Sequence, residues 1–552
     1  MLLHDKAAMR NLLASIAPAL LIAACTGGPA DLKDPPVLRV TSPERALVKD
    51  GAGDVVVKGV ATPNEGGIPV SKVTVNNVSA NVAADGSFQA TVQIQEGASF
   101  IETIALDSDG GKAVDTRAVH AGSIRNAAAN VDNAMTASMS TGAFAKISAA
   151  AGPIVKGMNI AEMLAPMQPM QHAGDEAGPD CLYEQVFVND VKFSDVQIQL
   201  IPQNGGLGFR FQVDNLDVPG RADYAVACLD GSTNIRVTAS RVVVAGTLLV
   251  SPNGMKGFKT DLVDQDITLT GLNVQASGVP GTIMGMIDFD GWISSIIGYG
   301  AELAMEPMMN SALGGLAGPK AITVLGKNLR MEVSPTDISF GNDGALVSMS
   351  MSMGIGGAEA AKYVYVPNGN PTMDPGNGFQ LGLADDLANG MMSQAKEIGL
   401  LNLEMPANGG TFDSTSISMT LPPMINANGD GSMQIILGDM MATFKAGGTP
   451  VAKAAVNAKI ALKVATAGNG YAVALELGKP ELMFNILDDI ANETRLSNAD
   501  LETAAAGCIE AQIAHISALL VNIPLPAIAG LQMRNLTVGS DNGFVMVKGN
   551  FE

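Results

Sequence analysis

The sequence predicts an α+β protein, in which an N-terminal β-sandwich precedes a duplicated body of antiparallel strands around long helices. Three observations indicate this class. Short strands separated by turns fill residues 37–121, and a helical pattern that is apolar over most of its circumference covers 291–319. One strand–turn–strand pattern occurs twice, at 326–351 and at 530–547. Its spacing of roughly two hundred residues is too long for a solenoid repeat.

The composition narrows the possible partners. Apolar types make up 47% of the 552 residues but aromatic types only 4%, and there are 30 methionines. Such a chain buries apolar surface with flexible side chains, which suits either a loosely specified core or a surface that accepts lipid chains. The net charge of −21 argues against nucleic acid and against electrostatic docking on anionic lipid head groups.

Residues 1–24 have the layout of an export signal. Lys6 and Arg10 precede an apolar run that is too short to span a bilayer and that ends at Cys25. The segment Ile22-Ala23-Ala24-Cys25 resembles a bacterial lipobox. This resemblance implies cleavage before Cys25 and acylation of that cysteine; a plain secretory signal is the alternative.

Thr26 follows the cysteine where an aspartate would be the usual cue for retention in the inner membrane. The sequence is therefore similar to lipoproteins sent to the outer membrane. Residues 25–36 contain glycines and prolines and predict a tether. We expect a lipid-anchored protein of the cell envelope, at the outer membrane, on either its periplasmic or its surface face.

Residues 37–121 predict an antiparallel sandwich of short strands. The run from VVVKGVATP through VSKVTVNN to DGSFQATVQIQEGASFIETIALDSDGG resembles bacterial Ig-like modules of exported proteins. The resemblance implies a spacer or adhesion module without chemistry. Asp107 and Asp109 fit a turn between strands better than a calcium site, which needs more ligands.

The body predicts a mixture of helices and strands. Residues 124–151 are rich in alanine, methionine and serine and predict a helix, followed by a loop over 165–180. Val196, Ile198 and Leu200 then alternate with polar residues, as a half-buried strand does. In the second part of the body, residues 381–400 predict another helix.

The two copies of the repeated pattern are hairpins, each preceded by an apolar helix. We expect Asn342-Asp343-Gly344 to form the turn of the first hairpin, and Asn542-Gly543, a strong hairpin signal, to form that of the second.

Taken in order, these features resemble the tubular lipid-binding (TULIP) family, typified by bactericidal permeability-increasing protein and the plasma lipid-transfer proteins. The motifs that carry the resemblance are VNDVKFSDVQIQL, CLDGSTNIRVTAS, FQLGLADDLANGMM, LPPMINANGDGSMQIIL and NIPLPAIAGLQMRNLTV. The resemblance implies two lipid-binding halves, 122–362 and 379–552, joined by a connector at 363–378. Each half would be a highly curved sheet wrapped around a helix, with an apolar pocket for acyl chains. The chain lacks the basic tip of members that bind lipopolysaccharide, so endotoxin neutralisation does not carry over.

The apolar faces of the predicted helices supply candidate lining residues for these pockets. Burying an acyl chain gains roughly 0.8 kcal/mol per methylene, so no charged contact is needed to hold one. Ordinary core packing is the alternative for each residue. The candidates are Phe144, Ile147, Met158, Ile293, Ile297 and Met309 in the first half, and Leu387, Met391, Ile509, Ile513, Ile516 and Leu520 in the second.

Three cysteines lie outside the signal. An exported protein meets an oxidising compartment, and Cys181 and Cys228 in the same predicted half are the natural disulfide pair. The family resemblance also implies one disulfide in the first half. Cys508 lies in a helical pattern and is interpreted as a buried thiol.

The sequence contains no Gly-x-Ser-x-Gly elbow, no His-Glu-x-x-His and no glycine-rich phosphate loop. Its four histidines are not paired at metal-ligand spacing. We therefore predict a non-enzymatic protein without cofactor or metal, which holds or transfers phospholipid or a similar amphiphile. The alternative is an envelope structural or adhesion protein whose Ig-like module binds a glycan or a protein.

Overall fold

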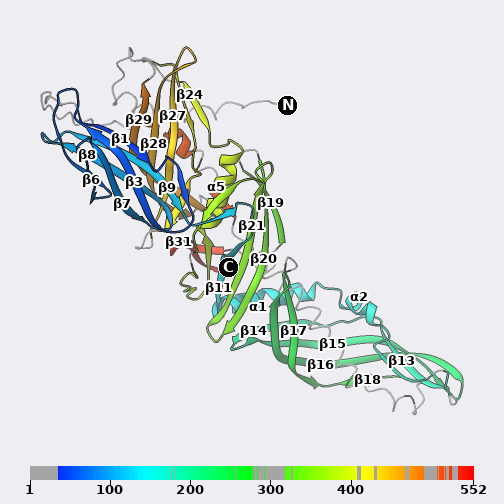
Figure 1. Ribbon diagram of the computed structural model, residues 1–552. Helices are drawn as coiled ribbons and strands as arrows, with labels where there is room; N and C mark the ends of the chain where they lie inside the picture. The colour runs from blue at the N-terminus through cyan, green and yellow to red at the C-terminus, as the bar shows by residue number, and fades with distance from the viewer. Residues whose placement is uncertain are drawn as a thin grey trace, which may run out of the picture.

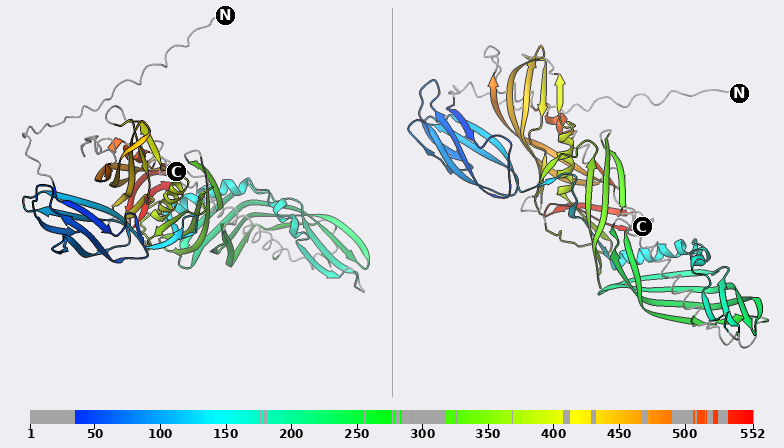
Figure 2. Two further views of the ribbon diagram at one scale, coloured as in Figure 1. Left: turned by 45° about the horizontal axis from the view of Figure 1, so that its top comes forward. Right: turned by 45° about the vertical axis from the view of Figure 1, so that its right-hand side comes forward.

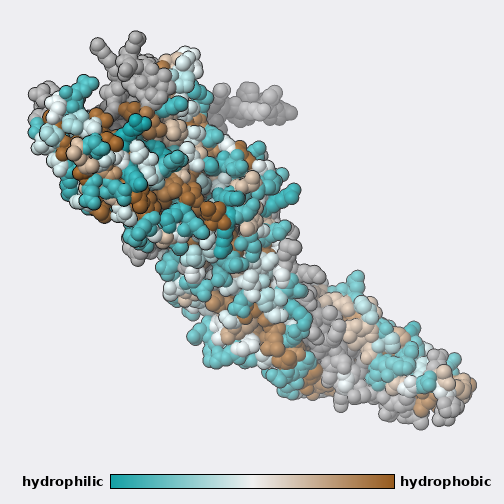
Figure 3. All heavy atoms as spheres, in the orientation of Figure 1, coloured by the Kyte–Doolittle hydropathy of each residue, from teal (hydrophilic) through white to brown (hydrophobic). Residues whose placement is uncertain are grey.

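The computed structural model describes residues 35–551 apart from 176, 179–180, 255–256, 277, 279–282, 284–290, 292–317, 325–326, 368, 407–411, 428–431, 467–471, 490–505, 508, 515, 517–520 and 525–532. The molecule is elongated (Figures 1 and 2): a β-sandwich and a second sheet lie side by side at one end, a central sheet follows, and a long sheet extends to the other end. The face seen in Figure 3 is mostly hydrophilic, with apolar residues in a few patches. Among the described residues, no helix has the length and apolar character that a membrane span requires.

The N-terminal sandwich is built from two sheets, and its strands β3 and β7 bury every second side chain. Val57 on β3 and Phe88 on β7 project from one sheet, and Val75 and Ile101 from the other, into a shared core. The strand orders are β1-β3-β7-β6 and β2-β9-β8-β4-β5. The bounds are β1 Val37–Ser42, β2 Leu47–Lys49, β3 Gly53–Thr62, β4 Val70–Val75, β5 Val78–Ser79, β6 Asn81–Val82, β7 Ser87–Ile94, β8 Gly97–Asp107 and β9 Lys112–Ala121.

The central sheet joins strands from both parts of the body in the order β19-β20-β21-β11-β23-β32-β31. β11 and β23 pair antiparallel in its middle; each has the second strand of a hairpin as its other neighbour, and each continues into a helix. The arrangement is therefore two-fold about the β11–β23 pair. The bounds are β11 Val131–Ser140, α1 Thr141–Lys156, β19 Gly318–Val324, β20 Lys327–Gly341, β21 Gly344–Ile355, β23 Phe379–Ala384, α5 Asp385–Glu397, β31 Met533–Asp541 and β32 Phe544–Phe551.

The long sheet at the far end, the distal sheet, has the order β12-β13-β15-β16-β17, with β14 paired to β15 and β18 to β16. Helix α1 packs along β14 on one face of this sheet. The bounds are α2 Ile160–Leu164, the 3₁₀ turn η1 Ala165–Met167, β12 Gln171–Asp175, β13 Leu182–Val188, β14 Asp195–Gln203, β15 Gly206–Val226, β16 Leu229–Pro252, β17 Phe258–Thr270 and β18 Asn273–Gln275.

The sheet beside the sandwich, the proximal sheet, has the order β24-β25-β27-β28-β29-β30, with β26 paired to β27. A two-stranded ribbon, β10–β22, lies between the sandwich and the central sheet. The bounds are β10 Ser123–Asn126, β22 Lys362–Tyr365, β24 Leu403–Pro406, β25 Ser414–Ser418, β26 Met424–Ala427, β27 Met433–Ala446, β28 Thr449–Thr466, β29 Ala472–Asp489 and β30 Val521–Pro524.

The predicted fold class is wrong in its helices. Of the described residues, 65% lie in strands and 12% in helices, so this part of the protein is not a set of sheets wrapped around long helices. The α-helices with defined bounds in the described ranges have 16, 13 and 5 residues. The helix predicted over 291–319 falls almost entirely outside the described residues.

Two predicted helices are also wrong in their extent. Residues 124–126 belong to β10 and 131–140 form β11, and the helix begins only at Thr141. Likewise 381–384 complete β23 before α5 begins at Asp385. β11 lies at the centre of the sheet with most side chains buried on both faces. Burial between two covered faces outweighs the helix propensity of its alanines and methionines.

Both predicted hairpin turns are confirmed. Gly341 pairs with Gly344 at the end of β20–β21, and Asp541 pairs with Phe544 at the end of β31–β32. Asn542 and Gly543 both have positive φ, as a tight hairpin turn requires.

Candidate functional site

Helix α1 is fixed tightly against β14 of the distal sheet. The Ser140 side chain caps the helix by accepting a hydrogen bond from the Ala143 N–H at 3.2 Å. The Ser148 hydroxyl accepts from the Leu200 N–H of β14 at 2.9 Å. A Cβ at Gly152 would lie 2.9 Å from the Val196 carbonyl oxygen, so glycine lets the helix approach the strand. The apolar face of α1 therefore lies directly on the sheet.

The inner face of the distal sheet is apolar along its length. Val196, Ile198 and Leu200 of β14 are buried while the residues between them are exposed. The same side of the sheet carries Phe209, Phe211, Val213 and Val218 of β15 and Ile235, Val237, Val242 and Val244 of β16, all buried in one cluster. This face is the first candidate site.

The described lining candidates of the first half lie at this face. Phe144 and Ile147 are each 1% exposed on α1, and the Phe144 ring lies 6.2 Å from that of Phe340. Met158 is partly buried against the same cluster. Each is in close packing with protein, and whether any also contacts a lipid stays a prediction. Ile293, Ile297 and Met309 lie outside the described residues.

The candidates of the second half belong to the same apolar cluster. Leu387 and Met391 of α5 are buried, Ile509 and Ile516 are fully buried, and Ile513 is partly buried. Leu520 lies outside the described residues. The cluster is continuous from the distal sheet to the proximal sheet, so the two sets of candidates share one apolar interior.

The predicted disulfide is present, with Cys181 and Cys228 joined by an S–S bond of 2.07 Å. Cys228 lies in the tight turn between β15 and β16, and Cys181 immediately precedes β13. The bond ties the start of β13 to the far tip of the distal sheet. Cys25 and Cys508 lie outside the described residues.

Sequence reasoning missed the polar role of α5. The Gln394 side-chain amide donates to the carbonyls of Ala127 and Met353, both at 2.9 Å, and its oxygen accepts from the Ile355 N–H at 2.6 Å. Asn389 exchanges two hydrogen bonds with the backbone of Ile425. The helix thus connects the central sheet to β26 by satisfying backbone groups of both.

Asp386 lies in the first turn of α5 and is 3% exposed. Burial raises the pKa of its carboxyl to about 7, although the Val366 N–H donates to it and Arg125 lies near it. The guanidinium of Arg125 stacks on the Tyr365 ring, 3.4 Å from its centroid. A pair of adjacent aspartates at a helix start gives no sequence signal of this burial.

Sequence reasoning also missed how the sandwich joins the body. Asp439 of β27 is 1% exposed, and its carboxylate accepts from Arg45 at 2.9 Å and from the N–H groups of Ala46 and Ala118 at 2.7 and 3.0 Å. Arg45 also pairs with Asp115 at 3.0 Å. Three donors of the sandwich therefore bind this buried carboxylate of the proximal sheet.

Three asparagines of the proximal sheet extend this contact. Asn457 donates to the Thr116 carbonyl at 2.9 Å, and Asn485 accepts from the Thr116 N–H at 3.0 Å. Asn426 accepts from the Ala98 N–H at 3.0 Å. The edges of β8 and β9 are thus hydrogen-bonded to the body, so the sandwich is not a loosely tethered module.

His120 of β9 is buried at the same contact. It is 1% exposed, and its Nε2 has no hydrogen-bond partner. Burial lowers the pKa of its imidazole to about 4, so the ring is neutral at pH 7. It occupies a buried position on β9.

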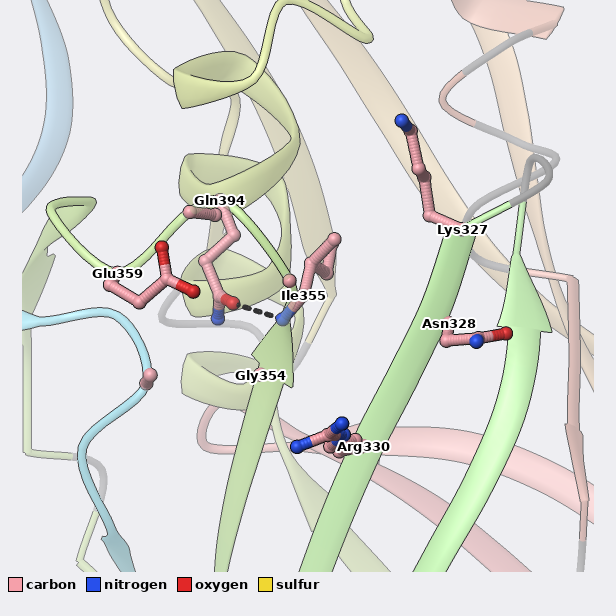
Figure 4. Close-up of a pocket in the computed structure, with 10 residues that line it drawn as sticks. Lys327, Asn328, Arg330, Gly354, Ile355, Glu359 and Gln394 are labelled. Carbon is pink, nitrogen blue, oxygen red and sulfur yellow. Dashed lines mark hydrogen bonds between the residues drawn. The ribbon is translucent and has the colours of Figure 1, made fainter.

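A second candidate site is a polar cavity of about 580 Å³ beside the central sheet (Figure 4). Its walls come from the start of β20, the end of β21 with the turn after it, and α5. Lys327, Arg330 and Glu359 are the charged residues that line it. Within the described residues, no group of three or more His, Cys, Asp or Glu side chains could hold a metal ion.

No protein-family model matches the chain, and no curated protein matches it in sequence. Among solved structures, the chain is similar to lipopolysaccharide binding protein, with a TM-score of 0.36 and 12% identity over 76% of this chain and 99% of that chain. It is also similar to P47 of Clostridium botulinum E1, with a TM-score of 0.27 and 6% identity over 76% and 98% of the two chains. P47 from Clostridium botulinum A2 gives a TM-score of 0.26 and 8% identity over 75% and 96%. At TM-scores this low, these overlaps carry no argument about function.

Proposed function

We propose that this protein is a non-enzymatic lipid-binding lipoprotein of the cell envelope, which holds or transfers the acyl chains of phospholipid or a similar amphiphile. The observation that carries the proposal is the length of the apolar inner face of the distal sheet. Its buried apolar positions run from Leu207 to Ala222 on β15 and from Ile235 to Leu248 on β16. At about 3.3 Å per residue these spans extend roughly 40 to 50 Å.

Helix α1 is much shorter than the face on which it lies. Its 16 residues span roughly 24 Å at 1.5 Å per residue. Within the described part of the chain, α1 lies along only part of this apolar face, and a face of this length is suited to extended hydrocarbon. Each methylene that left water for this face would gain roughly 0.8 kcal/mol.

Three methionines of the segment that leads from α1 to β12 favour a variable occupant. Met158, Met167 and Met170 are partly buried against the cluster. Methionine adapts its shape to irregular contents at little cost, so these positions suit chains of differing length.

Anchoring and location belong to the proposal on sequence grounds. Acylation of Cys25 and the tether of residues 25–36 would hold the body near an envelope membrane, with the outer membrane as the proposed site. The proposed division into the sandwich, 37–121, and two lipid-binding halves, 122–362 and 379–552, rests on the sequence pattern.

Native mass spectrometry with organic extraction tests the proposal, using the chain from Ala30 onward purified from its native host. Phospholipid or another acylated molecule at a defined ratio to protein is the expected result. A fluorescent fatty acid should also bind, and an unlabelled fatty acid should displace it. A protein that arrives empty and takes up no fatty acid would refute the proposal, and the adhesion alternative through the sandwich would replace it.

A further inference from the structure

Resting on the proposed lipid function, we propose that Glu184 of β13 binds the ammonium head group of an amphiphile. The chain of that amphiphile lies along the apolar inner face of the distal sheet. Glu184 thus determines which class of head group the face selects.

Glu184 is on the same side of the distal sheet as the apolar inner face. Val186, two residues further along β13, is fully buried in the apolar cluster, and side chains two residues apart on a strand share one face. Val186 is directly opposite Ala222 of β15, which belongs to the same cluster. Glu184 is directly opposite Tyr224, which is partly buried against it. A carboxyl group therefore stands on the inner face, towards the far tip of the sheet (Figure 1).

The carboxyl of Glu184 is buried and only partly satisfied. The residue is 0% exposed, and the Gln171 side-chain amide donates to its Oε1 at 2.8 Å. Its buried Oε2 has no hydrogen-bond partner among the described residues, and no lysine or arginine of these ranges is ion-paired to it. Burial raises the pKa of this carboxyl, against the opposing effects of Gln171 and of the nearby His172. An acceptor atom is thus left unmet in an apolar setting, which is costly.

An ammonium group satisfies this carboxyl better than the other common head groups do. It donates an N–H to Oε2 and supplies the positive charge that a buried carboxylate needs. A hydroxyl group donates but brings no charge. A carboxylate or a phosphate brings a second negative charge to the same place. The site therefore favours a cationic head group.

The inner face reaches solvent just beyond Glu184. Val226 follows Tyr224 by two residues on β15 and so lies on the same side of the sheet, and its direct partner on β16 is Leu229. Leu229 is 76% exposed. An amphiphile that enters the face at this tip leaves its head group at the level of Glu184, near water, while its chain extends towards α1.

The Tyr224 side chain is turned away from Glu184. Its ring lies over Gly231 of β16, where a Cβ would come within 2.5 Å of the ring, whereas Glu184 is on the opposite neighbour, β13. Its hydroxyl donates to the Gly278 carbonyl at 3.3 Å. The hydroxyl proton of Tyr224 is thus already used, and Oε2 of Glu184 remains for a ligand.

The disulfide holds this end of the face in place. Cys181 immediately precedes β13, and Cys228 lies in the turn between β15 and β16. The bond therefore fixes the strand that carries Glu184 relative to its neighbours at the tip. A site that is already in place loses less freedom on binding.

Isothermal titration of the chain from Ala30 onward with dodecylamine and with dodecanol tests the proposal, each below its micelle-forming concentration. We expect dodecylamine to bind roughly tenfold or more tightly than dodecanol, because only the amine pairs with the Glu184 carboxylate. E184Q keeps the shape and an acceptor for Gln171 but removes the charge, so both compounds should bind it equally. D266N is the matched control: Asp266 is exposed on the same sheet, opposite the outward-facing Ala245, and its loss should leave the preference unchanged.

The other outcomes separate this site from the lipid function. Equal binding of both compounds by the wild-type protein, or a preference that survives in E184Q, would overturn the proposal while the lipid function stands. A preference lost equally in D266N would assign it to overall charge and would also overturn the proposal. Binding of neither compound would refute the lipid function and this site with it. If E184Q does not fold, E184D decides: its charge is one methylene further from the ligand, so full retention of the preference would overturn the proposal and a reduced preference would support it.

Discussion

The distal and proximal sheets differ in how far their outer faces are buried. Along β14 of the distal sheet buried and exposed residues alternate, so one face packs inward and the other meets solvent. Along β27 of the proximal sheet, all six residues from 435 to 440 are buried. The cause is the sandwich, whose strands β8 and β9 pack on β26–β29.

We infer from this difference that the sandwich packs as part of the body's core. Ile436 and Met424 of the proximal sheet form an apolar cluster with Ala98 of β8, and Asp439 accepts hydrogen bonds from Arg45 and Ala118. A spacer would leave polar residues at these positions. The proximal sheet instead depends on its contacts with the sandwich, and three measurements test this contrast.

Removal of the Asp439 carboxylate has the largest expected effect. D439A leaves Arg45 and the N–H groups of Ala46 and Ala118 without their acceptor, which should cost about 3–5 kcal/mol of unfolding free energy. Urea denaturation measures the loss. The control is D217A on the distal sheet, where Asp217 pairs with Arg236 at 2.7 Å at the surface and solvent screens the pair. Equal losses in the two variants would contradict the contrast.

Acid should weaken the sandwich contact next most strongly. The pKa of His120 is about 4 in the folded protein and about 6.5 when it is exposed, so the unfolded state binds the proton more readily. The contribution of His120 to stability is therefore fully present above pH 6.5 and falls as the pH drops towards 4, by about 3 kcal/mol in total. Asp386, whose pKa burial raises to about 7, acts in the opposite direction, so the His120 term is read from the difference between the wild-type protein and the variant. Thermal unfolding across this range should show a flatter profile for H120Q. An unchanged slope in that variant would assign the acid sensitivity to other groups.

A methyl group at Gly438 should have the smallest of the three effects. Its Cβ would lie 2.5 Å from the Ala118 Cβ of the sandwich, so the two sheets must separate slightly. Overpacking of this kind costs about 1–3 kcal/mol. G341A is the matched control, because a Cβ there meets only the Asn204 side chain at 3.9 Å. Equal urea midpoints for the two variants would show that the contact yields without cost.

Sequence patterns predicted those parts of the fold that depend on residues close together in the sequence. The alternation of Val196, Ile198 and Leu200 predicted β14, and the Asn-Gly turn at 542–543 predicted a hairpin, because period and turn chemistry act over a few residues. The disulfide followed from the number and placement of the cysteines.

What the sequence could not supply depends on distant partners. Residues 131–140 have helix-forming composition and become β11 because they pair with β21 and β23 and are buried on both faces of the central sheet. Asp439 and Gln394 are ordinary polar residues in the sequence. Their roles depend on the docked sandwich for Asp439, and on Ala127 after β10 and the end of β21 for Gln394. Arg330 and Gly354, far enough apart to look unrelated, meet through strand pairing.

Because β11 pairs with β23 in the middle of the central sheet, cutting the chain between them exposes two strand edges. A cut within 363–378 would leave each fragment with a sheet border of buried, uncharged residues such as Ala137 and Leu381. Unpaired edge strands of that kind pair with other chains, and the protein then aggregates. The smallest piece that stays in solution is then the whole body with its sandwich, and truncated versions are expected in inclusion bodies.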